Sequence, residues 1–196
     1  NLGLHQYDVA IEYYQQALKI KPDFAKGYYN IGIALLHQGQ LDAAINSYKQ
    51  VLKIMPTFAG AHNNIGNAQK EKGDLQAAIN SYKNAILAKP DYAEAYYNMG
   101  IAQQDKGDLK AAINSYKKAL KIMPNHAVAY NNMGNAQKEK GDSQAAIECF
   151  RHALEIQPNY AEAYFNMSSA LQDNNDLEAA IESYMQALKI KPEYAE

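Results

Sequence analysis

The sequence predicts an all-α protein, an α-solenoid of antiparallel helix pairs, and two observations carry this prediction. The first is a 34-residue period that all six prolines obey: Pro22, Pro56, Pro90, Pro124, Pro158 and Pro192. The second is that each period holds two stretches whose apolar residues recur at helical spacing. A period of this length is typical of stacked repeats that bury their apolar faces only against neighbouring repeats.

The repeat from Ala127 to Pro158 shows how the sequence specifies one helix pair. Helix A is predicted over 127–140 and helix B over 143–156. Between them, Gly141 suits a left-handed C-terminal residue and Asp142 suits an N-cap, so the two helices form a tight hairpin. Pro158 prevents helix B from continuing. The stripes that face a partner are Tyr130, Met133, Gly134 and Gln137 in helix A, and Ala146, Ile147, Phe150, Ala153 and Leu154 in helix B.

The same repeat carries a pattern of spaced residues: Tyr130, Met133-Gly134, Ala146, Phe150, Ala153 and Pro158. This pattern resembles the tetratricopeptide repeat (TPR), and the resemblance covers essentially the whole chain. It implies a right-handed α-solenoid superhelix whose concave groove, lined by the A helices, binds protein partners.

The repeat phase divides residues 1–196 into a single TPR array. Residues 1–22 form a partial repeat, with Asn1 to His5 aligned to the end of a helix A and helix B over Tyr7 to Ile20. Five full repeats follow at 25–56, 59–90, 93–124, 127–158 and 161–192, and 193–196 begin a further one. Each full repeat is expected to start at an N-cap after its proline, with capping boxes at Asp91–Glu94 and Asn159–Glu162. We expect exposed apolar stripes at both ends, hence weak end-to-end self-association.

The composition narrows the class of protein. The 196 residues are 47% apolar and 20% charged, with a net charge of -2 and no basic cluster that would favour nucleic acid. No apolar run is long enough to cross a membrane. The single cysteine, Cys149, favours a reducing, cytoplasmic location, although a targeting signal cannot be judged in a sequence that starts mid-repeat. The five histidines are scattered, with no motif for a metal, nucleotide or other cofactor, so we expect no enzyme activity.

A second period of 68 residues lies inside the first. The segment from Asn63 to Asp74 returns almost unchanged at Asn131 to Asp142, so two types of repeat alternate. The other type has an aromatic before the shared Asn: Tyr29, Tyr97 or Phe165. This alternation is explained either by ligand binding or by recent duplication without selection for a ligand.

One helix A position holds asparagine in every full repeat. This ladder consists of Asn30, Asn64, Asn98, Asn132 and Asn166. A primary amide suits the backbone of an extended peptide, whatever the peptide's side chains. The predicted peptide-binding groove is therefore the ladder with Tyr29, Tyr97, Phe165, Asn67, Asn135, Lys70 and Lys138. The alternative is that the ladder supports hydrogen bonds between repeats.

The ladder, with segments such as AYNNMGNAQKEKGD, also resembles the TPR array of O-linked N-acetylglucosamine transferase-like proteins. Two hypotheses result: an interaction scaffold that binds an extended peptide, or the substrate-recruiting part of a larger glycosyltransferase or sulfotransferase. A clamp for an acidic C-terminal peptide is a weaker third, since the basic residues on this face are few and offset by acidic ones.

Overall fold

The computed structural model describes the backbone of residues 2–195 and the side chains of residues 6–194. Eleven α-helices and one short 3-10 helix make up this part, which contains no strand. The helices are α1 Leu2–Ile20, α2 Ala25–His37, α3 Leu41–Ile54, α4 Ala59–Glu71, α5 Leu75–Ala88, α6 Ala93–Asp105, α7 Leu109–Ile122, α8 Ala127–Glu139, α9 Ser143–Ile156, α10 Ala161–Asp173 and α11 Leu177–Ile190, with η1 Pro192–Ala195. The all-α fold class is confirmed.

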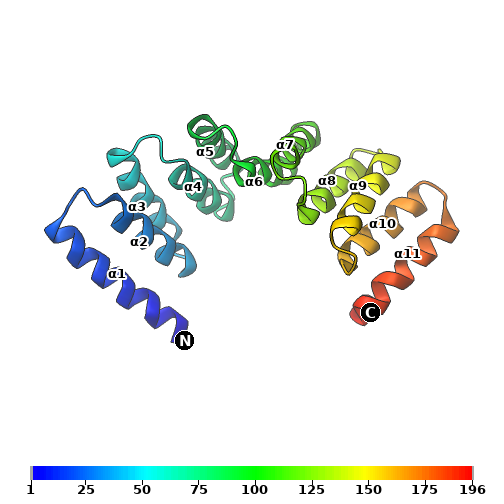
Figure 1. The fold of residues 1–196 in the computed structure, drawn as a ribbon, viewed down its shortest axis with the longest axis horizontal. Helices are drawn as coiled ribbons and strands as arrows, with labels where there is room; N and C mark the ends of the chain where they lie inside the picture. The colour runs from blue at the N-terminus through cyan, green and yellow to red at the C-terminus, as the bar shows by residue number, and fades with distance from the viewer. Residues whose placement is uncertain (1, 196) are drawn as a thin grey trace. The chain divides into compact units, whose positions relative to one another are not determined.

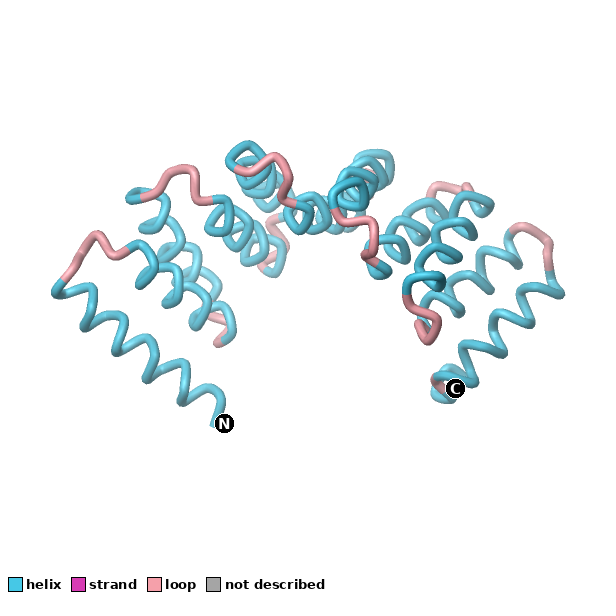
Figure 2. Tube along the Cα trace, viewed as in Figure 1, coloured by secondary structure: helices cyan, strands magenta, loops and turns pink. Residues whose placement is uncertain are grey.

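The chain forms two compact units, which we describe separately. Unit 1 extends to Ala102 and unit 2 begins at Gln103, so the division falls within α6. In unit 1, α2 packs against α3 and α4 against α5; in unit 2, α8 packs against α9 and α10 against α11 (Figure 1). Short loops connect the helices in both units (Figure 2). The four full repeats that lie within one unit are thus helix pairs, with the even-numbered helix as helix A and the odd-numbered helix as helix B.

The tight turns inside the repeats follow the predicted chemistry. Gly39, Gly73, Gly107 and Gly141 all adopt positive φ, between 72° and 89°. In the last repeat Asn175 takes this position with φ 61°, which asparagine tolerates better than most residues. The N-cap role of Asp142 is confirmed, since its Oδ1 accepts a hydrogen bond from Ala145 N at 3.1 Å. Helix B therefore starts where the sequence places it.

The first helix is longer than its sequence pattern suggested. α1 runs without a break from Leu2, whereas helix B was expected to start at Tyr7. The turn position holds glycine in four full repeats and Asn175 in the last, whereas this segment has His5 there. Glycine and asparagine tolerate the left-handed conformation better than histidine, so the turn is disfavoured here and the helix continues. Asn1 lies outside the described residues.

The prediction that helix A is capped by the residue directly after the proline was wrong for four helices. The N-caps of α2, α4, α8 and α10 are the next residues along, Phe24, Phe58, His126 and Tyr160. In α8, His126 Nδ1 accepts a hydrogen bond from Ala129 N at 3.2 Å, so the imidazole is a capping group. The aromatic residues at the other three positions make no side-chain cap. They contribute to packing instead.

Each unit has its core between consecutive helix pairs. In unit 1 the largest fully buried side chains include Tyr48 and Tyr82, and in unit 2 Phe150 has the same role. These rings lie against a glycine of helix A: a Cβ added at Gly66 would lie 2.5 Å from the Tyr82 ring. The glycine therefore sets the distance between the two helices, because any side chain there would overlap the ring.

Candidate functional site

The asparagine ladder lies half-buried on the A helices, and its amides make hydrogen bonds within each unit. In unit 1, Asn30 Nδ2 donates to Tyr14 Oη at 2.8 Å and Asn64 Nδ2 donates to Tyr29 Oη at 3.1 Å. In unit 2, Asn166 Nδ2 donates to Asn131 Oδ1 at 3.0 Å. A primary amide has two N–H donors and one carbonyl acceptor, so each of these bonds uses one donor. The ladder therefore joins neighbouring helix pairs as well as presenting polar groups.

Asn98 Nδ2 has two acceptors in the preceding repeat. Its Nδ2 lies 3.2 Å from both Asn63 Oδ1 and Asn67 Oδ1. Asn67 Oδ1 also accepts from Tyr82 Oη at 2.8 Å. Because its donors point at two acceptors of the preceding repeat, Asn98 has less capacity left for a ligand than Asn30 or Asn166.

The residue before the ladder asparagine differs between the two repeat types, and its chemistry differs accordingly. Asn63 and Asn131 are fully buried. Asn63 Nδ2 donates to Glu94 Oε1 at 3.1 Å, and Asn131 Nδ2 donates to Glu162 Oε1 at 3.0 Å. These two glutamates were expected to close capping boxes on their own helices. Both glutamates accept a hydrogen bond from a buried asparagine of the preceding repeat, which gives that amide a partner.

A pocket of about 340 Å³ in unit 1 lies beside the first ladder residue. It is lined by Ala25, Lys26, Tyr29, Asn30, Val51, Met55 and Phe58. The Tyr29 ring meets Phe58 edge-on, with ring centroids 5.2 Å apart and an interplanar angle of 83°. Burial raises the pKa of the Tyr29 hydroxyl, and the charge of Glu94 adds to this rise. The phenol is therefore a neutral, fixed wall of a mainly apolar pocket.

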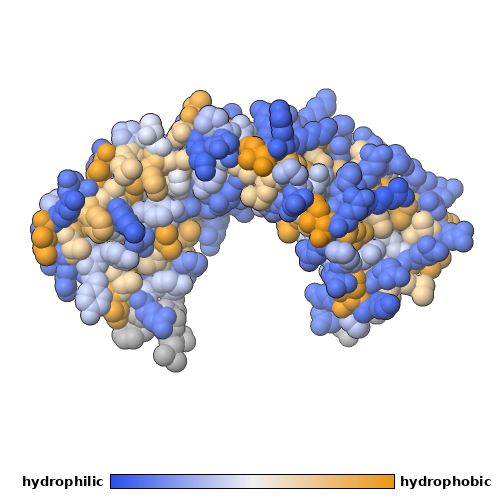
Figure 3. Space-filling view, in the orientation of Figure 1, coloured by the Kyte–Doolittle hydropathy of each residue, from blue (hydrophilic) through white to orange (hydrophobic). Residues whose placement is uncertain are grey.

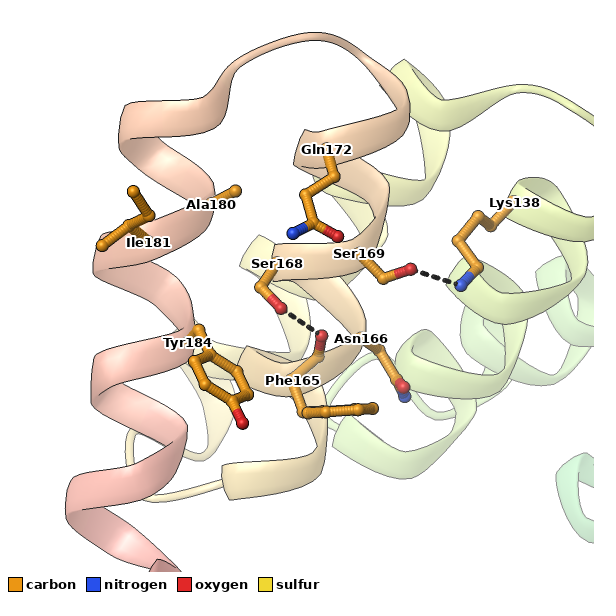
Figure 4. A pocket seen from close by; sticks show the side chains of 9 residues that line it. All are labelled: Lys138, Phe165, Asn166, Ser168, Ser169, Gln172, Ala180, Ile181 and Tyr184. Carbon is orange, nitrogen blue, oxygen red and sulfur yellow. Dashed lines mark hydrogen bonds between the residues drawn. The ribbon is translucent and has the colours of Figure 1, made fainter. Parts of the chain in front are cut away.

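A second pocket, of about 320 Å³, lies beside the last ladder residue, in unit 2. Figure 4 shows Phe165 and Asn166 of α10 lying between Lys138 of α8 and Tyr184 of α11. Lys138 Nζ donates to Ser169 Oγ at 2.9 Å, and Ser168 Oγ donates to the Phe165 carbonyl at 2.7 Å. The pocket also contains Gln172, Ala180 and Ile181. Its wall is thus more polar than that of the unit 1 pocket.

The other predicted site residues all lie on the A helices, with different degrees of exposure. Tyr97 on α6, Lys70 on α4, and Asn132 and Asn135 on α8 are half-buried. Of the three aromatic residues, Tyr29 and Tyr97 are half-buried and Phe165 is 39% exposed. Phe165 therefore presents more of its ring to a ligand than Tyr29, whose hydroxyl is held by Asn64.

A polar pair joins the two helices of a repeat where helix A has a glutamine and helix B a serine. Ser81 Oγ donates to Gln69 Oε1 and Ser115 Oγ donates to Gln103 Oε1, each at 2.6 Å. In the next repeat the serine is replaced by Cys149, and Gln137 Oε1 is buried without a partner. Where helix A has leucine instead of glutamine, as at Leu171, the serine Ser183 donates to the Tyr164 carbonyl.

Two buried groups have unusual electrostatics. Burial raises the pKa of the Cys149 thiol to about 11, so the thiol stays protonated and unreactive near neutral pH. Burial also raises the pKa of the Tyr48 hydroxyl, which has no hydrogen-bond partner. Asn64 lies close enough to offset part of this rise, but its N–H points at Tyr29. Neither group has the setting of a catalytic residue.

A metal site and a membrane-spanning helix each place requirements on the described residues. Among the described residues, no three His, Cys, Asp or Glu side chains lie close enough together to hold a metal ion. None of the described helices is both long and apolar enough to cross a membrane. Apolar side chains appear as separate patches among hydrophilic ones on the face in Figure 3.

Helix pairs of this length, repeated every 34 residues around a glycine–aromatic contact, define a class of helical-repeat scaffolds. Two family models identify the class: one described as tetratricopeptide repeat matches residues 91–159 and 127–193, and one described as TPR repeat matches 4–39, 34–73 and 67–107. The chain belongs to the tetratricopeptide repeat family and is a TPR scaffold. The resemblance of the sequence to the tetratricopeptide repeat is confirmed.

Several solved structures share the fold. A crystal structure of MamA protein has a TM-score of 0.79 and 27% identity, and the match covers 87% of this chain and 93% of that one. A MamA structure from Desulfovibrio magneticus RS-1 has a TM-score of 0.80 and 20% identity, covering 86% and 96%. YrrB, described as a TPR protein with an unusual peptide-binding site, has a TM-score of 0.77 and 22% identity, covering 91% and 92%. No curated protein matches the sequence.

Sequence reasoning missed the residues that complete the two pockets. Val51 and Met55 come from α3 and its C-cap, while Ala180, Ile181 and Tyr184 come from α11. A signal was present, because Met55 occupies the position before the proline, where the other repeats have lysine or glutamine except for Met123. Only the packing shows that this position lies next to helix A.

Proposed function

We propose that this TPR scaffold binds an extended peptide or partner segment along its A helices. One observation carries the proposal: each unit has a pocket lined by a ladder asparagine and the aromatic residue directly before it. In unit 1 these are Asn30 and Tyr29, and in unit 2 they are Asn166 and Phe165. A side chain that enters such a pocket places its own backbone beside an amide.

The ladder asparagines would bind a peptide through the amide groups that are not used in hydrogen bonds within the protein. Asn30 and Asn166 each use one N–H internally, which leaves one N–H and the carbonyl for a peptide backbone. Backbone recognition of this kind tolerates many sequences, so the pockets supply the specificity. Phe165, 39% exposed next to Tyr184, is the aromatic anchor in unit 2. The proposed site also includes Asn64, Asn98, Asn132, Tyr97, Asn67, Asn135, Lys70 and Lys138.

The proposal treats residues 1–196 as one TPR array with a protein or peptide ligand, without nucleic acid, membrane or cofactor. A reducing, cytoplasmic setting agrees with the buried thiol of Cys149. A further part of the proposal is weak association through α11. Ile181 is 62% exposed there, whereas Ile147, at the same position of the preceding repeat, is 1% exposed under α10. Sedimentation over a wide concentration range tests this part; a strictly monomeric species contradicts it.

The second hypothesis, that the chain recruits substrates for a larger glycosyltransferase or sulfotransferase, depends on the recurring asparagines and on segments such as AYNNMGNAQKEKGD. Asparagine at this position also joins neighbouring repeats here, so its recurrence has a structural explanation. The scaffold function accounts for the same residues without a catalytic partner. Reading the sequence that follows residue 196 in the intact protein distinguishes the two.

A peptide array tests the proposed function. The 196-residue chain is applied to an array of random 15-residue peptides, and selected peptides are measured by fluorescence anisotropy. Asn30→Ala and Asn166→Ala are expected to weaken binding more than tenfold together, with unchanged helical circular dichroism. Asn46→Ala is the matched control, because this exposed asparagine lies on the helix B α3, outside the proposed site, and its loss should leave the affinity unchanged. No selected peptide, or equal affinities for all three variants and the unmodified chain, would contradict the proposal.

A further inference from the structure

The unit 1 pocket has a composition that no equivalent position in the chain repeats. We infer that it is a specificity subsite that takes one bulky apolar side chain of an extended peptide, with a carboxylate from the next peptide residue beside Lys26. The inference rests on the proposed function, since it names the peptide chemistry that the A-helix face selects. It concerns residues of unit 1 alone.

The apolar wall is the first distinguishing feature. In unit 1 it combines Val51, Met55 and Phe58. The equivalent residues in the four later repeats are Ala85, Lys89 and Tyr92; Ala119, Met123 and His126; Ala153, Gln157 and Tyr160; and Ala187, Lys191 and Tyr194. Each later set replaces at least one apolar group by a polar or charged one. An apolar side chain of a ligand would therefore bury more apolar surface in the unit 1 pocket than at the equivalent positions of the later repeats.

The three apolar walls of the unit 1 pocket differ in rigidity. This difference allows the pocket to accept apolar side chains of different shapes. Val51 is 1% exposed and fixed in the core. Phe58 is held edge-on by Tyr29, whose hydroxyl accepts from Asn64. Met55 is 46% exposed, and its unbranched thioether adapts to the partner it covers. The pocket thus has two fixed walls and one adjustable wall.

The charge at the rim is the second distinguishing feature. Lys26 is exposed and has no hydrogen bond or ion pair with any described side chain. The equivalent positions in the other repeats are Gly60, Glu94, Val128 and Glu162, so only this repeat has a cation there. Glu94, whose charge acts on the pocket residue Tyr29, accepts a hydrogen bond from Asn63. A free ammonium at the edge of an apolar pocket favours a carboxylate from the ligand.

The size limits the occupant. At about 340 Å³ the pocket lies near the lower end of the range of roughly 300–1,000 Å³ for small-molecule sites. A pocket of this volume can hold one large side chain but leaves little room for a cofactor. The match is therefore to a peptide with leucine, methionine or phenylalanine followed by an acidic residue.

Methionine methyl NMR tests the inference with a control inside the chain. The probe is an acetylated, amidated Gly-Ser-Gly-Leu-Asp-Gly-Ser-Gly peptide, titrated to millimolar concentration into the chain with ¹³C-methyl methionine. The Met55 methyl signal is expected to shift, while that of Met123, equally exposed at the same repeat position beside His126, stays in place. Peptides with Ala-Asp or Leu-Lys at the centre are expected to bind at least fivefold more weakly.

Variants taken from the chain's own repeats keep the fold. Met55→Lys introduces the residue found at Lys89 and Lys191, and Lys26→Glu introduces that of Glu94 and Glu162. Each of these two variants should bind the Leu-Asp peptide at least fivefold more weakly than the unmodified chain, and Met123→Lys should bind it equally well. Equal binding of Leu-Asp and Ala-Asp peptides, an unmoved Met55 signal or an unaffected Met55→Lys variant overturns the subsite. If peptides selected on the array still bind that variant, the subsite alone has failed, whereas failure of all array binding refutes the proposed function.

Discussion

The near-identical segments from Asn63 to Asp74 and from Asn131 to Asp142 form similar helices, yet their polar groups have different partners. In unit 1, Gln69 accepts from Ser81, and Asn67 accepts from Tyr82. In unit 2 the corresponding helix B supplies Cys149 and Phe150 in place of the serine and tyrosine. Gln137 Oε1 is consequently buried without a partner, and Asn135 receives no bond from the ring.

The difference shows that helix A determines the backbone and helix B determines how the polar groups of helix A are used. The glycine contact is the same in both copies: a Cβ would lie 2.5 Å from Tyr82 at Gly66 and 2.6 Å from Phe150 at Gly134. Packing is therefore conserved between the copies while hydrogen bonding is not. Four predictions test this separation, from the largest expected effect to the smallest.

Replacing the close-contact glycine should damage both copies alike. Gly66→Ala and Gly134→Ala each push the helix away from the buried ring and should destabilise the protein by about 1–3 kcal/mol. Urea unfolding measures the loss. A clear difference between the two variants would show that the glycine contact is not equivalent in the two copies.

Removing a tyrosine hydroxyl should have opposite consequences in two repeats of unit 1. Tyr82→Phe loses the bond to Asn67 and should cost about 0.5–1.5 kcal/mol. Tyr48→Phe removes a buried hydroxyl without a partner, so its stability should be unchanged or higher. Thermal or urea unfolding of both variants checks this, and equal losses would show that Tyr48 has a partner in solution. Phe150 shows that phenylalanine fits this position.

Cys149→Ser should restore the pair with Gln137 and stabilise the protein by about 0.5–1.5 kcal/mol. The matched control, Ser81→Cys, should lose a similar amount by breaking the bond to Gln69. A gain that persists in a Gln137→Leu background would contradict the explanation, because no acceptor is left there.

The raised pKa of Cys149 predicts that the stability of the protein falls slightly at alkaline pH. Burial raises the pKa of the folded-state thiol from 9.0 to about 11. The unfolded thiol loses its proton first, so this stabilisation is complete below about pH 9 and is lost as the pH rises towards 11. The urea midpoint of the unmodified chain should fall more steeply over this window than that of Cys149→Ser. Parallel curves would show that the thiol ionises equally in both states.

The period, the extent of the B helices of the full repeats and the tight turns could be read from the sequence because they depend on local chemistry. Gly141 and Asp142 specify a turn wherever they occur together, and helix B of that repeat runs over the predicted residues. The internal hydrogen bonds of the ladder and the N-caps of the A helices could not be predicted in this way, because they depend on which side chains meet across repeats. Asn64 reaches Tyr29 from 35 positions away, and no spacing rule within one repeat identifies that contact. The pocket at Met55 was missed for the same reason.

Photocrosslinking tests the central claim, that a peptide lies along the A helices, most directly. Benzoylphenylalanine replaces Phe165 beside Asn166 in one variant, and Glu148, exposed on helix B α9, in another. Both variants are irradiated with a peptide selected on the array. The account predicts a crosslink to the peptide from position 165 and none from position 148. Equal yields from both positions, or a crosslink from position 148 alone, would contradict it.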